Sequence, residues 1–585
     1  MENENSNQLV SLDPSKIVNG YLKQTDWRTK ENSNASFSFP ALVMQCAGAV
    51  GSAYWLNEVY TPEIAEAHKS AAIHIHDLSM ISGYCAGWSL RQLIEEGFNG
   101  VADKTDSKPA SHLSTLVNQM INFLGTMSNE WAGAQAFSSF DTYLSAFIKK
   151  DSLSDKEVRQ CLQNFIFGAN TSSRFGGQPV FSNLTFDLVC PEDLKNTQAI
   201  IGGKKQNFTY GECQEEMTRL NKIYIDIILE GDASGKTFYY PIPTYNVTKE
   251  FDWDSEVAQK LFTLTGKYGT PYFQNFLNSD LNPTDVRSMC CRLRLDKREL
   301  AKRGGGLFGA NEFTGSIGVV TLNLPRIGYL SKTEEELFQR LDQLLVIAKD
   351  SLEIKRVFLN DWFDKGLYPY TKRYLVSKFN NHFSTIGLVG MNECCTNFLH
   401  KDISTKEGLK LSQKILDYMR NRLSDFQEET GNMYNLESTP AESTCYRLAK
   451  HDKERYPDIL TAGTIAAPYY TNSSNLPVGY TDDVWKAIKH QELLQTKYTG
   501  GTVFHCFMNE GCEDWKKVRD FIKNLCANSV LPYFTYSPTF SVCTHGHGYV
   551  KGLTSICPKC AAEQKAEYLK QIEKMKQRIA EIEKE

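Results

Sequence analysis

The residues of this sequence that could carry chemistry are mostly thiols and amides. Cys290 and Cys291 stand side by side directly after Met289, and Asn323 lies in an apolar run just before Pro325. A lone pair of adjacent cysteines is more often two small core residues than a reactive site. A buried amide needs hydrogen-bond partners, and a bound substrate hydroxyl is one candidate partner for Asn323.

A second group, near the C-terminal end, has the spacing of a metal site. Cys543 is followed by His545 and His547, and then by Cys557 and Cys560. Two cysteines three positions apart on a tight turn, facing another pair of soft ligands across a short hairpin, provide the tetrahedral geometry of structural zinc. We expect Cys543, His547, Cys557 and Cys560 to bind Zn²⁺, with His545 as the alternative to His547. A site closed by four protein ligands does no chemistry at the metal.

Two further groups are polar and lie at the borders of predicted elements. The run 435–444, NLESTPAEST, precedes a predicted helix over 446–452. Hydroxyls at a helix start can cap it, which is the commoner outcome, and free N–H groups there can equally cradle a phosphate. His74 and His76 share one face of an alternating strand over 73–78, but no third ligand is nearby, so structural histidines are the better interpretation than a metal site.

The elements that must position these groups alternate between strand and helix. Apolar and β-branched residues predict strands at 288–293 and 317–323, and the charged, then glycine-rich run 297–310 between them predicts a mobile loop. Elsewhere we predict strands at 180–188, 238–247 and 383–389 and helices at 211–231, 254–278 and 333–365, with helical patterns over roughly 112–168. This order favours an α/β fold, a sheet with helices packed outside it.

Several of these stretches together resemble one family. Met289 to Arg292, a loop, and GVVTLNLPRI at 318–327 resemble the finger loop of anaerobic (class III) ribonucleoside-triphosphate reductases, which are glycyl radical enzymes. The segments GAQAFSSFDTYLSAF, TPAEST, YTNSSNLPVGYTDD and LLQTKYTGGTVFH also match, so the resemblance covers nearly the whole body. It implies a ten-stranded α/β barrel with the finger loop, 285–327, threaded through its centre.

The resemblance also implies roles for individual residues. A thiyl radical at Cys291 would take the 3′-hydrogen of a ribonucleoside triphosphate, and Cys85 would face it across the substrate and donate a proton as the 2′-hydroxyl leaves as water. Asn323 would hydrogen-bond the substrate, Ser443 and Thr444 would contact its phosphates, and Glu442 is a weaker acid/base candidate. The reductant stays open between formate, which Met289 favours, and a thioredoxin-like dithiol protein, for which Cys290 offers an extra thiol.

Relatives carry a radical glycine in an Arg-Val-X-Gly-Tyr segment after the zinc knuckle, whereas this sequence has AAEQKAEYLKQIEKMKQRIAEIEKE there. Tyr568, Ile572, Met575, Ile579 and Ile582 recur at spacings of four and three, which predicts a helix with one apolar seam. We therefore expect the glycyl radical on a separate polypeptide or a missing segment, docked by this helix. A radical-SAM activating enzyme, a homodimer and dNTP/ATP allosteric effectors bound near 112–168 follow from the resemblance.

Composition limits the remaining possibilities. The 585 residues are 41% hydrophobic and 12% aromatic, enough for a large core, and the formal charge of -5 gives no basic face for nucleic acid. No run of about 18 apolar residues or secretion signal is present, so we expect a cytoplasmic protein. Sixteen cysteines, two pairs of them adjacent, suit a reducing compartment.

The expected division is an N-terminal arm over 1–36, a reductase body over 37–537, a zinc ribbon over 538–560 and an amphipathic helix over 561–585. Two other functions remain possible at this point. A pyruvate formate-lyase-like acyltransferase also uses adjacent cysteines, although the zinc ribbon and LNLPRI argue against it. A non-catalytic regulatory or scaffold relative would explain the absent radical glycine, although the retained Cys85, Cys291 and Asn323 argue against it.

Overall fold

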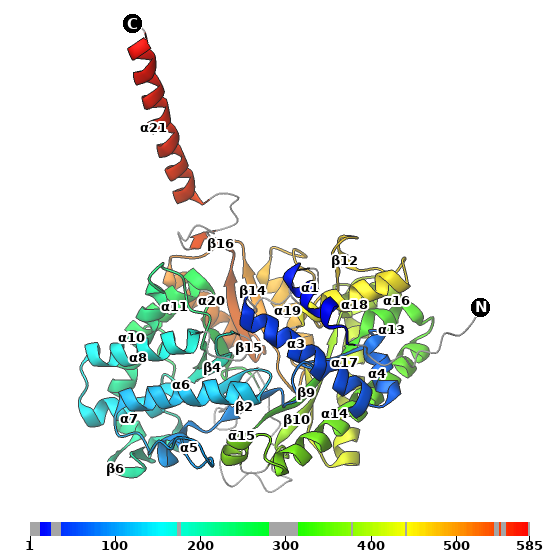
Figure 1. Cartoon of the computed structure of the whole chain (residues 1–585), viewed down its shortest axis with the longest axis horizontal. Helices are drawn as coiled ribbons and strands as arrows, with labels where there is room; N and C mark the ends of the chain where they lie inside the picture. The colour runs from blue at the N-terminus through cyan, green and yellow to red at the C-terminus, as the bar shows by residue number, and fades with distance from the viewer. Residues whose placement is uncertain are drawn as a thin grey trace.

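One large mixed sheet surrounded by helices organises the chain (Figure 1). The computed structural model describes residues 12–24, 37–171, 177–279, 314–375, 378–438, 441–542, 549–551 and 557–582. In pairing order the strands are β11 (Tyr434–Glu437), β10 (His382–Val389), β9 (Gly315–Asn323), β2 (Cys85–Trp88), β3 (Gln135–Phe137), β4 (Ser182–Phe186), β7 (Ile242–Val247), β8 (Tyr272–Asn275), β15 (Tyr533–Pro538) and β14 (Phe504–Met508), with β1 (Ile73–Ile75) beside β9.

The sheet consists of two parallel halves that run in opposite directions. Strands β2, β3, β4, β7 and β8 are parallel to one another, as are β9, β10 and β11, and β14 and β15. The halves meet at two antiparallel junctions, β2 with β9 and β8 with β15. This arrangement places the carboxyl ends of β9, β10 and β11 at one edge of the sheet.

Hydrogen bonds also connect the two end strands of this order. Gly500, just before β14, donates its N–H to the carbonyl of Leu436 in β11 at 2.7 Å, and Ser438 donates to the carbonyl of Gly501 at 2.7 Å. The Thr499 hydroxyl accepts the N–H of Leu436 at 2.9 Å. The backbone groups at the edge of β11 are therefore satisfied by the segment that leads into β14.

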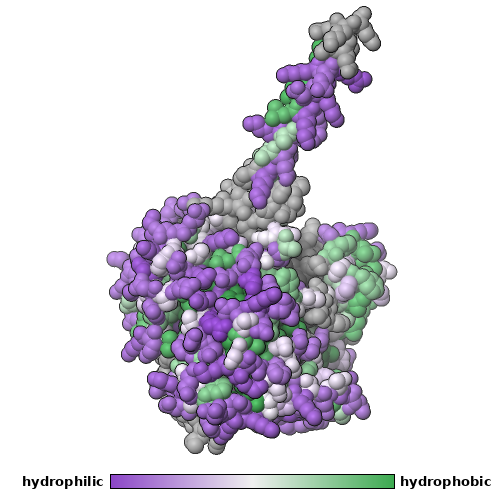
Figure 2. Space-filling view, turned by 90° about the vertical axis from the view of Figure 1, so that its left-hand side faces the viewer, coloured by the Kyte–Doolittle hydropathy of each residue, from purple (hydrophilic) through white to green (hydrophobic). Residues whose placement is uncertain are grey.

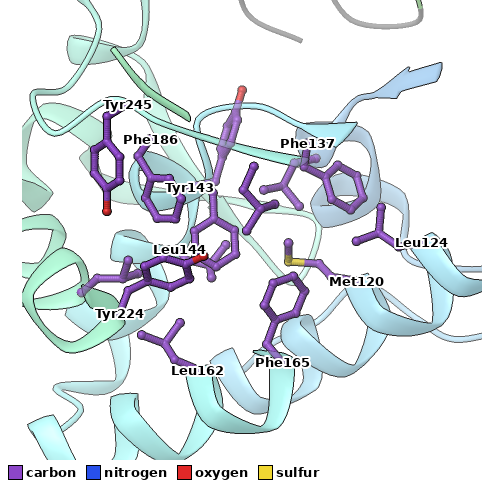
Figure 3. Packing of buried hydrophobic residues seen from close by; sticks show 14 of the residues in the cluster. Met120, Leu124, Phe137, Tyr143, Leu144, Leu162, Phe165, Phe186, Tyr224 and Tyr245 are labelled. Atoms are coloured by element: carbon purple, nitrogen blue, oxygen red, sulfur yellow. The ribbon is translucent and has the colours of Figure 1, made fainter. Parts of the chain in front are cut away.

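The outer face of the sheet, defined as the face on which the helices pack, is hydrophobic. In Figure 3 the aromatic residues Phe137 of β3, Phe186 of β4 and Tyr245 of β7 lie against side chains of the surrounding helices. The ring of Phe186 stacks on Tyr245 at 4.8 Å between centroids and lies 4.7 Å from Tyr224. Because alternate strand residues point to opposite faces, the residues between these positions point to the inner face.

Two long helices cover β9 to β11, and their ends show why they form. Helix α14 (Glu334–Asp364) begins after Thr333, whose hydroxyl accepts the Glu336 N–H, and carries three glutamates in its first turn. Helix α17 (Lys406–Thr430) is capped by Thr405 and ends at Gly431, which has a φ of 72°. Leu322 of β9, Ile386 of β10 and Leu436 of β11 are buried in the same cluster as residues of both helices.

The other elements are mostly helices around the sheet. They are α1 (Pro14–Leu22), α3 (Phe39–Tyr54), η1 (Trp55–Val59), α4 (Pro62–Lys69), α5 (Leu90–Glu96), α6 (Leu113–Glu130), α7 (Phe140–Asp151), α8 (Asp155–Asn170), α9 (Glu192–Lys195), η2 (Tyr210–Cys213), α10 (Gln214–Glu230), α11 (Glu256–Tyr268), α13 (Leu324–Leu330), α15 (Pro369–Tyr374), α16 (Met391–Leu399), α18 (Glu442–Arg455), α19 (Val484–Gln495), α20 (Trp515–Asn528) and α21 (Pro558–Ile582). Short paired strands are β5 (Gln198–Ile201) with β6 (Lys204–Thr209), β12 (Ala462–Gly463) with β13 (Pro468–Tyr469), and β16 (Phe540–Val542) with β17 (Tyr549–Lys551).

Most predicted elements are confirmed, and two predictions are wrong in part. The strands predicted at 180–188, 238–247, 317–323 and 383–389 correspond to β4, β7, β9 and β10, and the helices at 211–231 and 333–365 to α10 and α14. The helix predicted over 254–278 ends at Tyr268, because Gly269 takes a φ of 71° and a proline follows before β8. The helical region 112–168 contains the short strand β3. The strand predicted at 288–293 lies outside the described residues.

The C-terminal helix stands away from the body in Figures 1 and 2. Tyr568, Ile572, Met575 and Ile579 of α21 are 65%, 43%, 58% and 55% exposed. In Figure 2 hydrophobic residues interrupt its otherwise hydrophilic surface. Within the described part of the chain, none of the helices is both long and apolar enough to span a bilayer.

Candidate functional site

Cys85 begins strand β2 at the antiparallel junction between the two halves of the sheet. It is fully buried, and its Cα partner across the junction is Ser316 of β9. The strands approach closely here, because a Cβ on Gly315 would lie 2.0 Å from the carbonyl oxygen of Cys85. Only glycine fits that position, so the sequence itself permits this contact between the two halves.

A row of polar side chains crosses the inner face at the level of Cys85. The hydroxyl of Ser316 lies 2.8 Å from that of Thr385 in β10, and Thr385 is the Cα partner of Asn435 in β11. The neighbours of Thr385 and Asn435 along their strands, Ile386 and Leu436, are in the outer core. Alternation therefore places a thiol, two hydroxyls and an amide side by side on four adjacent strands of the inner face.

The predicted reactive residues Met289, Cys290 and Cys291 lie outside the described residues. The segment that contains them, 280–313, connects β8 to β9, and the described chain resumes at Thr314. The carbonyl of Thr314 accepts the N–H of Gly87 in β2 at 2.8 Å, two residues from Cys85. The chain that follows Cys291 thus enters β9 beside the strand that carries Cys85.

Asn323 lies at the opposite end of β9, about 23 Å from Ser316 for seven residues of extended strand. It is fully buried and precedes α13, where its side-chain oxygen accepts the Arg326 N–H at 3.4 Å. Its amide nitrogen donates to the carbonyl of Ala71 at 2.9 Å and to Asp452 Oδ2 at 2.8 Å. The structure does not bring Asn323 to Cys85.

Asp452 is the centre of a buried network at that end of the strand. Its Oδ1 accepts from Arg326 Nε at 2.6 Å, and its Oδ2 accepts from the hydroxyl of Tyr470 at 2.6 Å as well as from Asn323. Burial and the nearby carboxylate raise the pKa of Tyr470 far above its ordinary value. The carboxylate is fully enclosed and satisfied by three donor groups, which is what a buried charge requires.

Ser443 and Thr444 lie in the first turn of α18, at the carboxyl edge of β9 to β11. Ala441, which precedes the helix, packs in one cluster with Val389, the last residue of β10. The helix begins at Glu442 and has no side-chain cap at Ala441. Ser443 and Thr444 are its second and third residues. The alternative of a capped start is thus not observed. Glu442 begins the helix, and its side chain lies outside the described residues.

A buried arginine lies one turn further along α18. Arg447 is 8% exposed, and its guanidinium contacts His74 Nδ1 at 3.1 Å and the carbonyl oxygen of His68. Burial, and to a smaller degree the positive charge of Arg326, lower the pKa of Arg447 to about 10. Positive charge is therefore held close to the N-terminal end of this helix.

His74 and His76 use their rings in hydrogen bonds within the protein. His76 Nε2 lies 2.8 Å from the hydroxyl of Thr321, and burial, aided by the charges of Lys355 and Arg447, lowers the pKa of His76 to about 3. The pKa of His74 is also far below its ordinary value, mainly through burial. Among the residues that the structure describes, no three potential ligands gather as a metal site.

The predicted zinc ligands fall partly within the described residues. Cys557 immediately precedes α21, and Cys560 lies in its first turn. Cys543, His545 and His547 lie outside the described residues, between the antiparallel strands β16 and β17, which pair Val542 with Tyr549. Thiolate and imidazole donors suit structural zinc, and the zinc ribbon stays a prediction here.

Sequence reasoning missed three members of the polar row, Ser316, Thr385 and Asn435. Each is a small polar residue at an inner position of a strand, next to a buried apolar residue of the outer face. The alternation of polar and apolar residues is the one signal that the sequence offers for them. The sequence does not show which strands lie side by side, because Cys85 and Ser316 are far apart along the chain.

Comparison with known proteins gives one consistent family. Residues 31–574 match the family model described as anaerobic ribonucleoside-triphosphate reductase. The curated enzyme of that name from Haemophilus influenzae is 22% identical, and the alignment covers 93% of this chain and 80% of that protein. The enzyme of that name from Enterobacteria phage T4 is 23% identical, with 83% of each chain covered.

The fold is also similar to solved structures. The anaerobic ribonucleotide reductase from Thermotoga maritima with dATP bound in the specificity site superposes with a TM-score of 0.72 at 20% identity. That match covers 95% of this chain and 92% of the other. At this identity the superposition shows a common fold.

Proposed function

This chain belongs to the anaerobic ribonucleoside-triphosphate reductase family, oxidoreductases that convert ribonucleoside triphosphates to 2′-deoxyribonucleoside triphosphates, and we propose that Cys85 and Cys291 are its reacting thiols. The observation that carries this assignment is the position of Cys85. It is buried on the inner face, at the junction with β9, the first described strand after Cys291 in the sequence. An acyltransferase or a non-catalytic scaffold would not need a thiol there.

The proposed reaction begins at Cys291. As a thiyl radical, its sulfur takes the 3′-hydrogen of the bound ribose, so that an S–H bond forms, the C–H bond breaks and the radical passes to C3′. The S–H and C–H bonds are of similar strength, so the transfer is reversible at little cost. Cys85 then donates a proton to the 2′-hydroxyl, which leaves as water, because a positioned acid lowers the barrier to that departure.

The radical itself is stored elsewhere. None of the Gly-Tyr pairs in these 585 residues carries the motif of the radical glycine. A glycyl radical, generated by a radical-SAM activating enzyme, supplies the unpaired electron to this site from a segment outside the sequence. The apolar seam of α21, with Tyr568 and Met575 more than half exposed, supports docking of that segment here.

The triphosphate of the substrate would lie at the start of α18. Unpaired N–H groups and the positive end of a helix dipole attract phosphate, and Ser443 and Thr444 add hydroxyl donors. Arg447, one turn further along and buried beside neutral histidines, adds positive charge. Glu442 at the same turn remains the weaker acid/base candidate.

The substrate contact that the resemblance implies for Asn323 stays a prediction. Its amide holds Asp452 and the carbonyl of Ala71, which favours a role in fixing the end of β9. We therefore assign Asn323 a positioning role.

The final electrons come from formate, as Met289 favours, or from a thioredoxin-like protein acting on a disulfide that involves Cys85, Cys290 or Cys291.

The remaining assignments concern architecture and partners. We propose that the hydrogen bonds between β11 and the segment before β14 close a ten-stranded α/β barrel with the finger loop, 285–327, in its centre. Cys543, His547, Cys557 and Cys560 would hold a structural zinc ion that cross-links the 538–560 ribbon. A homodimer with dNTP/ATP effectors bound near α6 to α8 follows from the family. The cytoplasmic location and the N-terminal arm over 1–36 stay proposals that rest on the sequence alone.

The test is an anoxic assay of the full chain with a family activating enzyme and a synthetic or relative-derived glycyl segment. Formation of a 2′-deoxyribonucleoside triphosphate from a ribonucleoside triphosphate, dependent on all three components, is the expected result. Acetyl transfer between pyruvate and coenzyme A instead would establish the acyltransferase. A glycyl radical signal from this chain and the activating enzyme alone would contradict the external radical.

A further inference from the structure

We propose that Asn435 of β11 binds a ribose hydroxyl of the nucleotide substrate. The inference rests on the proposed function, since it adds a substrate-binding residue to the inner-face site that contains Cys85. The first observation is a buried amide whose hydrogen-bonding atoms lack partners among the described residues. Asn435 is 1% exposed, and neither its side-chain oxygen nor its side-chain nitrogen has a partner among the described residues.

Such an amide destabilises the substrate-free fold. A buried donor or acceptor that has lost water and gained no partner costs folding free energy, and Asn435 contains both. Asn323 shows what a structural asparagine looks like in the same chain, because its amide nitrogen and oxygen are all engaged. A polar side chain left unsatisfied in this way has a simple explanation when its partner arrives with a ligand.

The side chain of Asn435 points to the inner face. Tyr434 and Leu436, its neighbours along β11, are both buried in the outer core with α17, so alternation directs Asn435 the other way. Its Cα partner is Thr385, and the Thr385 hydroxyl bonds to Ser316, the Cα partner of Cys85. Asn435 is therefore the far end of the row that begins at the thiol.

The spacing of this row suits a sugar. Three steps of about 4.8 Å between neighbouring strands, about 14 Å across the sheet, separate Cys85 from Asn435. The row also shifts along the strands between β9 and β10, where Ser316 pairs with Phe383 and Thr385 pairs with Val319. A ribose lying between them could present its 2′-hydroxyl to the thiol and another hydroxyl to the amide. A hydroxyl can both donate and accept a hydrogen bond, so it can pair with either the NH₂ group or the oxygen of the amide. A phosphate oxygen only accepts hydrogen bonds.

The neighbouring loop supports the amide without bonding to it. A Cβ on Gly500 would lie 3.0 Å from both Cγ and Nδ2 of Asn435 and 3.0 Å from the Leu436 carbonyl. Glycine at this position therefore lets the loop pack against the amide while leaving its polar atoms unused. A larger residue would push the side chain from its place on the row.

The test is the variant Asn435→Leu in the full chain, which keeps the size of the side chain and removes its polarity. Binding of CTP, 2′-deoxy-CTP and 3′-deoxy-CTP is measured under anoxia without the activating enzyme, in competition with labelled CTP. The wild-type chain should bind CTP roughly 10-fold more tightly than the analogue lacking the recognised hydroxyl, the effect of one net hydrogen bond. Asn435→Leu should bind both equally, at the weaker level.

Stability separates a binding role from a structural one. Because no described residue hydrogen-bonds the side chain of Asn435, Asn435→Leu should unfold at the same temperature as the wild type or higher. Asn323→Leu is the matched control and should unfold at a clearly lower temperature. A large loss of stability in Asn435→Leu, or failure of that variant to fold, would assign the amide a structural role and overturn the proposal.

The binding results distinguish two kinds of failure. Unchanged discrimination between CTP and its analogues in Asn435→Leu overturns the assignment of Asn435 while leaving the proposed function intact. No binding of CTP by the wild-type chain overturns the proposed function, and the role of Asn435 with it.

Discussion

Cys85 and Ser316 face each other as Cα partners at the antiparallel junction of β2 and β9. Each residue belongs to a different half of the sheet, so their contact is the point at which the two parallel halves join on this side. Gly315 permits the close approach, since any Cβ there would collide with the Cys85 carbonyl. The thiol is therefore held by backbone pairing on rigid strands and not by a loop, as a precisely placed reactive group requires.

Replacing Cys85 by alanine should remove activity while leaving the fold. The thiol is the proposed acid for departure of the 2′-hydroxyl, so deoxynucleotide formation should fall by about 10²-fold to 10⁴-fold. The loss of one sulfur atom from the core should cost only about 1 kcal/mol. Turnover under anoxia and thermal unfolding measure the two effects separately.

The matched control is Cys506→Ala, which removes another fully buried strand cysteine, in β14. This sulfur lies in the outer core and has no proposed part in catalysis. The control should unfold slightly earlier than the wild type and keep most of its activity. Equal activity losses in the two variants would mean that Cys85 matters only for packing.

Replacing Asp452 by alanine should strongly destabilise the chain. The change leaves the Arg326 guanidinium, the Asn323 amide and the Tyr470 hydroxyl without their common acceptor in a buried site. Loss of one partner of a buried ion pair costs about 3 to 5 kcal/mol. The measurement is the shift of the thermal unfolding midpoint.

Asp458→Ala provides the comparison, since Asp458 also accepts a tyrosine hydroxyl, from Tyr329 at 2.7 Å, but at an exposed site. Water replaces the lost acceptor there, so the midpoint should hardly move. Similar small shifts for both variants would show that the buried network contributes little.

Acid should destabilise the chain partly through His76. Its pKa is about 3 in the folded chain, mainly because of burial, against 6.5 for the ordinary imidazole. The unfolded chain therefore takes up a proton before the folded chain does, so the stability contribution is complete above pH 6.5 and is lost as the pH falls from 6.5 towards 3. His76→Gln should reduce the slope of stability against pH in this range by at most about 1.4 kcal/mol per pH unit, since the ring is partly exposed.

Thr321→Val separates this titration from the loss of a hydrogen bond. The variant removes the hydroxyl that His76 contacts but keeps the imidazole, so stability should fall by about 1 kcal/mol at all pH values with the slope retained. Stability of wild type and both variants is measured from pH 4 to pH 7. An unchanged slope in His76→Gln would show that other groups govern the acid response.

The chain should purify with one zinc ion bound through the C-terminal ribbon. Cys560→Ser replaces a soft thiolate at the start of α21 and should reduce the bound zinc well below that of the wild type, as measured by elemental analysis. Cys190→Ser, a change at a half-buried cysteine of the body, should leave the metal content unchanged. Equal zinc content in the wild type and Cys560→Ser would argue against the predicted ligand set.

Much of the fold was readable from the sequence because its elements are strongly patterned. The apolar run over 317–323 predicted β9, and the helical pattern over 333–365 predicted α14. Strands β3 and β8 were missed, since three or four residues inside helix-like surroundings give no periodicity to recognise. Cys85 was identified through family resemblance, and its surroundings were not.

The site shows the limit of sequence reasoning most clearly in its two asparagines. Asn323 lies in the more conspicuous motif, yet its amide is used to hold Asp452. Asn435 received no role, and its significance depends on what is absent around it, which only three-dimensional packing reveals. Pairing between distant strands decides which side chains meet, and no local pattern encodes that pairing.

Hydrogen transfer from C3′ of the ribose tests the central claim most directly. The active mixture of chain, glycyl segment and activating enzyme is incubated with a 3′-tritiated ribonucleoside triphosphate, and tritium released to water is counted for the wild type and Cys291→Ala. The wild type should release tritium during turnover, and Cys291→Ala should release none while Cys290→Ala still does. Tritium release that persists in Cys291→Ala would contradict the assignment of this thiol.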